Sequence, residues 1–203
     1  IFVVNEKNLS EEQKEFCRSY FAQILSPRLV PLIIRKSVRL PFLPDGNSYL
    51  GVKMSHKNRC SVRYAVVRIP TSSACPRFVV LPSAAGRHDI IFIDDIIRLM
   101  IDHIFFMFSY DEIGVYTFKI MRDAELTYDE DVSKSLFERI SEGVSNRRYG
   151  LPIRMIYDRD MPADMVEILA GKLGLDNSEM LAPGERYHMM KDLMKFPKVR
   201  PDL

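Results

Sequence analysis

Two strand-like segments separated by a short polar turn require this chain to build a β-sheet. Residues 49–54 and 62–69 are rich in apolar and β-branched side chains, and Lys57, Asn58 and Arg59 lie between them, which predicts a β-hairpin. The second segment is apolar on both of its alternating faces, as is typical of a strand inside a sheet rather than at its edge. The sheet must therefore be covered by other elements of the chain.

Further segments have the composition of short strands. They lie at residues 1–4, 77–82, 89–93, 115–122 and 153–158. Together with the hairpin they predict one mixed, mostly antiparallel sheet of about five to six strands. Residues 31–44 are interrupted by prolines, which predicts a connector between elements.

Two helices carry clear signals at their ends. Ser10 followed by Gln13 forms a predicted capping box, and Pro27 ends the helix that follows because it cannot continue the hydrogen-bond ladder. Pro162 is placed as the first residue of a helix that ends at Gly174. Both helices are short enough to pack across one face of a sheet.

Three more helices are predicted with weaker signals. Asp94 is expected to cap a helix over about residues 95–108, whose apolar side chains cover much of its circumference. Asp129 is expected to cap a helix over 130–148, and a last helix is expected over 186–195. The order of elements predicts one α+β domain spanning residues 1–203, with helices packed on the sheet. A polar break at residues 109–112 makes a boundary near residue 110 a less favoured alternative.

Charge and cysteine content exclude several classes of function. The net charge is only +2, from 29 basic and 27 acidic residues, so a surface built to hold nucleic acid is not expected and any anion site must be local. The three cysteines have no CxxC spacing and the four histidines are scattered. These patterns predict no disulfide framework, a reducing cytosol and no metal site. No apolar run is long enough for a membrane helix.

Several charged residues are candidates for chemistry, each with a plainer alternative. Arg122, just past a strand, suits a clamp on phosphate, or an internal pair with Asp123 or Glu125 at the end of that strand. His188 follows a glycine turn into the last predicted helix, where Arg186 and the helix N-terminus would favour an anion. An independent enzyme would need Arg122, Asp123, Glu125 and His188 to meet in one cleft.

Two other groups of residues are expected to be structural. Asp94 and Asp95 are adjacent, and helix capping explains them better than an acid–base pair, because paired carboxylates need environments that separate their pKa values. His103 lies within an apolar segment and is expected to be a core or interface histidine. The sequence contains neither GxxxxGK[ST] nor GxGxxG, so no ordinary nucleotide-binding loop is predicted.

Six segments spread along the chain form a specific combination. They are residues 63–70, 76–82, 94–98, 121–126, 160–162 and 187–193. Read in this order, the chain resembles the head (middle) domain of bacterial polyphosphate kinases, and the resemblance runs from the first residue to the last. It implies that the helical N-terminal domain and the two C-terminal domains of that family flank this domain and are absent from the chain.

The resemblance also implies an activity for the parent enzyme. Polyphosphate kinases transfer the terminal phosphate of ATP reversibly to polyphosphate through a phosphohistidine, and they require Mg²⁺. The catalytic histidines and magnesium-binding arginines of the family lie in the C-terminal domains, so the resemblance assigns no catalytic residue, metal ligand or cofactor to this chain. The fragment alone is expected to be inactive.

The head domain of the family is associated with subunit contacts and with framing the path of polyphosphate. The implied partners are the other domains of the same polypeptide, further copies in a homo-oligomer, and polyphosphate, with no role for nucleic acid. Arg122, Arg154 and Arg186 are the residues predicted to contact polyphosphate. The resemblance implies a cytoplasmic enzyme and leaves membrane association of the full-length protein open. The alternative is a stand-alone polyanion-binding or interaction module without enzymatic role.

Overall fold

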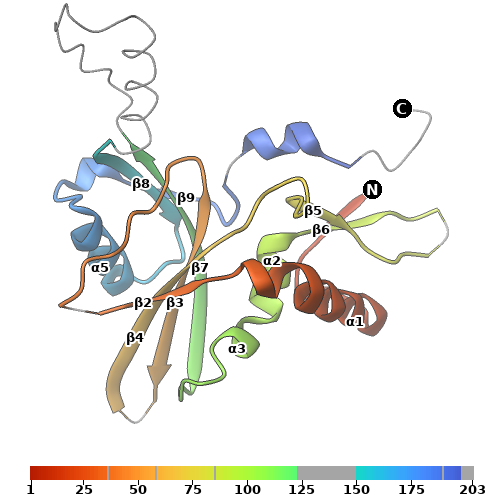
Figure 1. Cartoon of the computed structure of the whole chain (residues 1–203), viewed down its shortest axis with the longest axis horizontal. Coiled ribbons are helices and arrows are strands. Elements are labelled where there is room, and N and C mark those ends of the chain that lie inside the picture. The colour runs from red at the N-terminus through yellow and green to blue at the C-terminus, as the bar shows by residue number, and fades with distance from the viewer. Residues whose placement is uncertain (36, 58, 85, 123–149, 189, 198–203) are drawn as a thin grey trace, which may run out of the picture.

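A six-stranded sheet forms the larger half of the computed structural model, which describes residues 1–35, 37–57, 59–84, 86–122, 150–188 and 190–197. Its strands, in spatial order, are β2 (Pro31–Ile34), β4 (Arg59–Arg68), β3 (Ser48–His56), β7 (Glu112–Arg122), β8 (Pro152–Asp158) and β9 (Leu181–Gly184). The predicted hairpin is confirmed, since β3 and β4 pair antiparallel with Val52 opposite Ala65. Only β8 and β9 pair in parallel in this sheet (Figure 1).

A second sheet of three strands lies beside the first. Its order is β1 (Phe2–Val4), β6 (Asp89–Phe92) and β5 (Phe78–Val80), with β1 parallel and β5 antiparallel to β6. The sequence predicted a single sheet, and that detail is wrong. Strand periodicity indicates which residues form strands but not which distant strand each one pairs with. The α+β class and the mixed, mostly antiparallel pairing are confirmed.

Helix α1 (Glu11–Tyr20) begins as predicted. Ser10 Oγ accepts a hydrogen bond from the amide of Gln13 at 3.2 Å, and the Gln13 side chain accepts one from the Ser10 amide at 3.2 Å. The helix then continues as a π-helical turn (Phe21–Leu25) and a 3-10 turn (Ser26–Arg28). Pro27 therefore lies in the last turn of this helical segment, after the regular α-helix has already ended.

The predicted helix over residues 95–108 is wrong in detail. The structure has two short helices, α2 (Ile93–Leu99) and α3 (Ile101–Ile104), separated at Met100, whose φ of −105° and ψ of 17° are not helical. Asp94 does not cap α2, which begins after Phe92 without a side-chain cap. Apolar residues all around this segment gave no signal for the break.

Other differences concern the ends of elements. Helix α5 (Ala163–Leu173) follows Pro162 and ends at Gly174 in the left-handed region with φ of 71°, as predicted within one residue. The expected connector contains edge strand β2, and Pro31 is its first residue, a position in a strand where proline is tolerated. The expected helix over 186–195 is wrong: β9 precedes this region, and only a 3-10 turn (Met190–Lys195) follows. The predicted helix over 130–148 lies outside the described residues.

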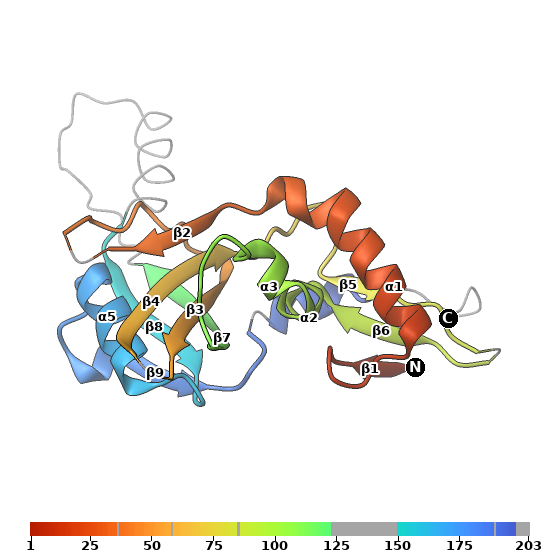
Figure 2. The same ribbon diagram turned by 90° about the horizontal axis from the view of Figure 1, so that it is seen from below.

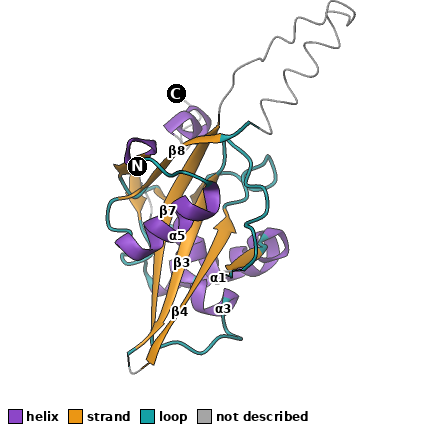
Figure 3. Cartoon of the chain, turned by 90° about the vertical axis from the view of Figure 1, so that its left-hand side faces the viewer, coloured by secondary structure: helices purple, strands orange, loops and turns teal. Residues whose placement is uncertain are grey.

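Both faces of the six-stranded sheet are buried. Along β3, Leu50 and Val52 point into a core that α1, α2 and α3 cover, and Tyr49 points into a second core under α5. Figure 2 shows the helices on the first side, and Figure 3 shows α5 lying across the strands. Gly51 lets α5 approach closely, because a Cβ there would lie 2.4 Å from Met165 Cε. Among the described residues no helix has the length and hydropathy of a membrane span.

The change from burial to exposure at the end of α3 can be tested with two neighbouring phenylalanines. Phe105 is fully buried, whereas Phe106 is 74% exposed. We expect Phe105→Ala to lower the free energy of unfolding by about 3–5 kcal/mol, because it leaves a cavity in the core. Phe106→Ala should change it by less than about 0.5 kcal/mol. Urea unfolding of both variants measures this, and equal effects would contradict the structure.

Candidate functional site

A buried ion pair between Arg77 and Asp94 connects the two sheets. Arg77 precedes β5 and Asp94 lies in α2; their Nη2 and Oδ2 atoms are 2.7 Å apart, and the side chains are 4% and 0% exposed. Arg77 Nη1 also donates to Ser48 Oγ of β3 at 3.3 Å and approaches Asp192 Oδ2 at 3.4 Å. One guanidinium therefore joins the small sheet, the large sheet, α2 and the C-terminal segment.

A second buried carboxylate, Asp95, gathers donors from three side chains. Arg98 Nη1 donates to Asp95 Oδ1 at 2.9 Å, and Arg186 Nη2 donates to the same oxygen at 2.8 Å. The Tyr187 hydroxyl donates to Asp95 Oδ2 at 2.6 Å. Arg186 also pairs with Glu6, so the network binds segments from both ends of the chain to α2.

Charges within this network balance. Three guanidinium groups (Arg77, Arg98 and Arg186) face three carboxylates (Glu6, Asp94 and Asp95), with Asp192 at the margin. Complete burial raises the pKa of Asp94, and the nearby guanidinium groups of Arg77 and Arg98 oppose that rise. Burial acts in the same direction on Glu6, but the hydrogen bond and charge of Arg186, with smaller contributions from a backbone hydrogen bond and the charge of Arg98, together outweigh it, and the pKa of Glu6 is lowered.

This arrangement can hold segments together but offers little for catalysis. Asp94 and Asp95 are neither helix caps nor an acid–base pair, because each accepts hydrogen bonds from buried arginines. Within the part of the chain that the structure describes, a few buried polar atoms of the network have no partner: Asp94 Oδ1 and the Nε atoms of Arg77, Arg98 and Arg186. Apart from these atoms, the charged groups of the network are bonded to one another, as is typical of buried ion pairs that hold segments of a fold together.

His188 is buried between β7 and the C-terminal segment. Its Nε2 lies 3.3 Å from the carbonyl oxygen of Thr117, and burial lowers its pKa, which favours the neutral ring. Residues 186–188 are not helical, so the helix N-terminus expected to favour an anion beside His188 is not there. His103, expected to be a core or interface histidine, is exposed and packs edge-on against Phe21 with ring centroids 5.9 Å apart, so it does not lie in the core.

Arg122, the last residue of β7, donates hydrogen bonds to backbone carbonyl oxygens. Its Nε and Nη2 donate to Leu43 O at 3.1 and 2.9 Å, and its Nη1 donates to Gly150 O at 2.7 Å. The guanidinium also lies 4.3 Å above the Phe42 ring. Asp123 and Glu125, the carboxylates considered as its partners, lie outside the described residues. The single cleft that an independent enzyme would need is therefore not tested by the described residues.

The structure does not gather the three arginines predicted to contact polyphosphate. Arg154 is exposed on β8 and lies opposite Met121. Because Met155 next to it points into the core under α5, Arg154 points to the other face of the sheet. Arg122 lies on the face of Leu43, which belongs to that core, and Arg186 belongs to the buried network. Their contact with polyphosphate stays a prediction.

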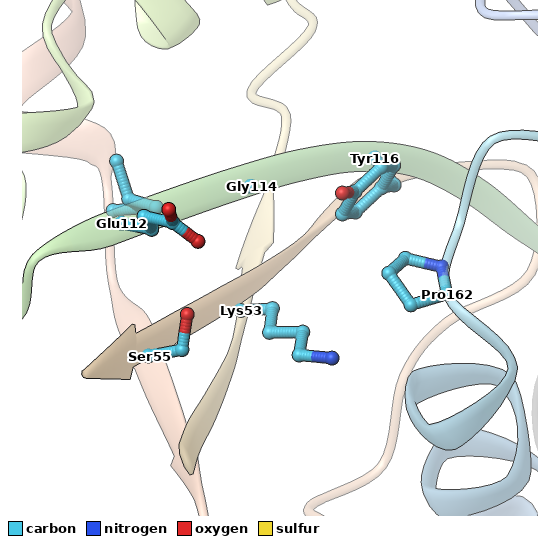
Figure 4. Close-up of a pocket in the computed structure, with 7 residues that line it drawn as sticks. Lys53, Ser55, Glu112, Gly114, Tyr116 and Pro162 are labelled. Carbon is cyan, nitrogen blue, oxygen red and sulfur yellow. The ribbon is translucent and has the colours of Figure 1, made fainter. Parts of the chain in front are cut away.

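A surface pocket of about 560 Å³ lies on the large sheet beside the start of α5 (Figure 4). It is lined by Lys53, Ser55, Glu112, Ile113, Gly114, Tyr116 and Pro162. The Lys53 ammonium donates to Asp164 Oδ2 at 2.6 Å, and the Tyr64 hydroxyl donates to the same oxygen at 2.6 Å. Since Asp164 already matches the charge of Lys53, the pocket has no excess positive charge for a phosphate. No motif in the sequence indicated it.

The structure describes most of residues 1–122, 150–188 and 190–197. Among these described residues, no three or more His, Cys, Asp or Glu side chains are placed to hold a metal ion. The most extensive group of buried charged side chains in the described part of the chain is the ionic network around Arg77 and Asp95. The sequence singled out Asp94, Asp95, Arg186 and His188 but gave no sign that Arg77 and Arg98 bind them.

Comparison with known proteins identifies the family. A family model described as polyphosphate kinase middle domain matches residues 12–196. The chain belongs to the polyphosphate kinase family. It is 39% identical over 206 residues to a polyphosphate kinase of Vibrio vulnificus (strain YJ016) and 38% identical over 203 residues to that of Escherichia coli (strain K12).

The chain corresponds to one part of these longer proteins. The two matches cover 100% and 98% of the chain but only 29% of each polyphosphate kinase. The crystal structure of polyphosphate kinase from Porphyromonas gingivalis has the same fold over 97% of this chain and 27% of its own, with a TM-score of 0.74 at 24% identity. The family resemblance found in the sequence is therefore confirmed.

Removing one member of the Arg77–Asp94 ion pair should lower the free energy of unfolding. Asp94→Ala leaves the Arg77 guanidinium buried without its main partner, and we expect the free energy of unfolding to fall by about 3–5 kcal/mol. The double variant Arg77→Met/Asp94→Leu should recover much of that loss, because an apolar pair leaves no buried charge. Asp176→Ala, at an exposed position, is the matched control and should change it by less than about 0.5 kcal/mol. Urea unfolding that gives similar losses for the two single variants would contradict this account.

Proposed function

We propose that this chain is the middle domain of a longer polyphosphate kinase, with an N-terminal domain before it and C-terminal catalytic domains after it. That enzyme transfers the terminal phosphate of ATP reversibly to polyphosphate through a phosphohistidine and uses Mg²⁺. The observation that carries the proposal is the match of residues 12–196 to the middle domain of polyphosphate kinases. The guanidinium groups of Arg77, Arg98 and Arg186 could bind phosphate, but each is paired with a buried carboxylate, which supports a structural role for this domain.

A docking role is supported by an apolar surface at the end of α3. Phe106 is 74% exposed and Met107 is 82% exposed, and the His103 ring lies beside Phe106 with centroids 6.3 Å apart. Neighbouring exposed aromatic and methionine side chains are typical of protein interfaces. We assign this surface to contact with another domain or another copy of the enzyme.

Arg154 is the best placed of the three predicted polyphosphate contacts. It is exposed on β8, whereas Arg122 binds the carbonyls of Leu43 and Gly150 and Arg186 binds Asp95. Of the three, Arg154 is therefore the residue proposed to contact polyphosphate directly, while Arg122 and Arg186 are engaged in contacts within the domain.

The two described cysteines agree with a cytoplasmic enzyme. Cys17 and Cys75 are buried free thiols, as a reducing compartment favours. Burial raises the pKa of Cys17 to about 11, so its thiol is neither a nucleophile nor easily oxidised at neutral pH.

Labelling with ATP tests whether catalysis resides elsewhere. The 203-residue chain, incubated with ATP labelled at its terminal phosphate and with Mg²⁺, should take up no acid-labile label, because the buried His188 is held against Thr117. The complete enzyme should be labelled, and His188→Ala in it should still be labelled. Label on the isolated chain that disappears in His188→Ala would refute the proposal, and His88→Ala is the matched control.

Docking through the α3 surface can be tested in the complete enzyme. We expect Phe106→Ser/Met107→Ser to weaken subunit association at least about tenfold, because losing buried apolar anchors costs more than about 1 kcal/mol. Sedimentation over a range of protein concentrations measures this. Val30→Ser, which changes an apolar side chain that is 67% exposed, should have no effect. An unchanged assembly in the double variant would remove this surface from the subunit interface.

A further inference from the structure

The last described segment of the chain crosses from the large sheet to the small one. We call residues 186–188 and 190–196 the C-terminal strap; it follows β9 and passes beside β5 and β6 (Figure 1). It touches the small sheet through two aromatic contacts. Tyr187 stacks on Phe92 with ring centroids 4.4 Å apart, and Phe196 meets the edge of Phe78 at 5.0 Å. Phe78 and Phe92 in turn pack together at 4.8 Å. The two rings of the strap and the two rings of the small sheet therefore form one continuous row.

The inner half of the strap is fastened by buried charges. Arg186 bonds to Asp95 and Glu6, the Tyr187 hydroxyl bonds to Asp95, and His188 is buried against Thr117. Lifting these residues would deprive the fully buried Asp95 of two of its three donors. An uncompensated buried carboxylate is expensive, so this half stays in place.

The outer half has weaker attachments. Its described ion pair joins Asp192 Oδ2 to Arg77 Nη1 at 3.4 Å, well beyond the 2.7 Å between Arg77 and Asp94, and the Asp192 side chain is 19% exposed. The side chains of Leu193 and Met194 are 49% and 89% exposed. When Asp192 leaves, Arg77 keeps Asp94 as its partner, so opening leaves no buried charge unpaired.

We propose that the C-terminal strap is a two-part latch in which Asp192 and Arg77 form the catch. The inner half anchors the strap to α2, while the outer half opens and closes over β5 as a unit. Closing brings Phe196 against the edge of the Phe78 ring and fixes the direction in which the chain continues. This part of the inference rests on the proposed function: the catch sets the position of the catalytic domains that follow this domain. It links that position to the Arg77 guanidinium, which joins the two sheets.

Hydrogen exchange followed by mass spectrometry on the complete enzyme tests the latch. Asp192→Asn removes the charge from the catch, and Phe196→Ala removes the aromatic contact. Each should speed exchange of the amides in residues 190–196 about five- to tenfold, since a charge-assisted contact or a ring contact of this kind stabilises a local closed state by about that factor. Helix α5 and residues 186–188 should exchange as before, and Asp176→Asn should change nothing.

Tyr187→Phe provides the contrast between the two halves. It removes a hydrogen bond to the buried Asp95, and we expect faster exchange over the inner half as well as the outer half. Unchanged exchange of residues 190–196 in both outer variants would overturn the proposal. Equal loss of protection in α5 would also overturn it, because the strap would then not open independently. Exchange needs no turnover, so either result leaves the proposed enzymatic role intact.

Discussion

The rest of this structure depends on the burial of Arg77 against Asp94. A guanidinium that is 4% exposed must find several acceptors, and its four acceptors come from three parts of the chain. Satisfying Arg77 therefore places β3, α2 and the strap around the start of β5. The two sheets share no strand, so this side chain is a principal bond between them, beside the core that α1, α2 and α3 complete.

The buried ionic network is held by many bonds, whereas two regions at the edges of the molecule are held by few. Asp95, Arg98 and Arg186 are held by mutual bonds that would be costly to break. Phe106 and Met107 at one edge and the outer strap at another have few such bonds and are exposed or weakly paired. In the multidomain enzyme proposed above, this division would let contacts to neighbouring domains adjust while the interior of this domain does not.

Much of the fold was predictable where a local pattern reports a local structure. The capping box at Ser10, the β3–β4 hairpin and the left-handed end of α5 at Gly174 follow from nearby residues. The prediction failed where apolar residues surround a segment, as at Met100, and where short strands choose between partners, as in the second sheet. For the site, Asp94 and Asp95 were expected to be structural through helix capping, but their role as acceptors for Arg77, Arg98 and Arg186 was not predicted.

By itself the sequence determined the α+β class, the alternation that buries both faces of the large sheet, the balanced charge and the resemblance to polyphosphate kinases. Only the tertiary structure decided which charges meet. Arg77 and Asp94 are 17 residues apart, and Arg77 and Asp192 are 115 apart. Periodicity and capping extend over a few residues, whereas the energy of a buried charge depends on every group around it in space. That is why the ionic network and the strap could be found only in the folded chain.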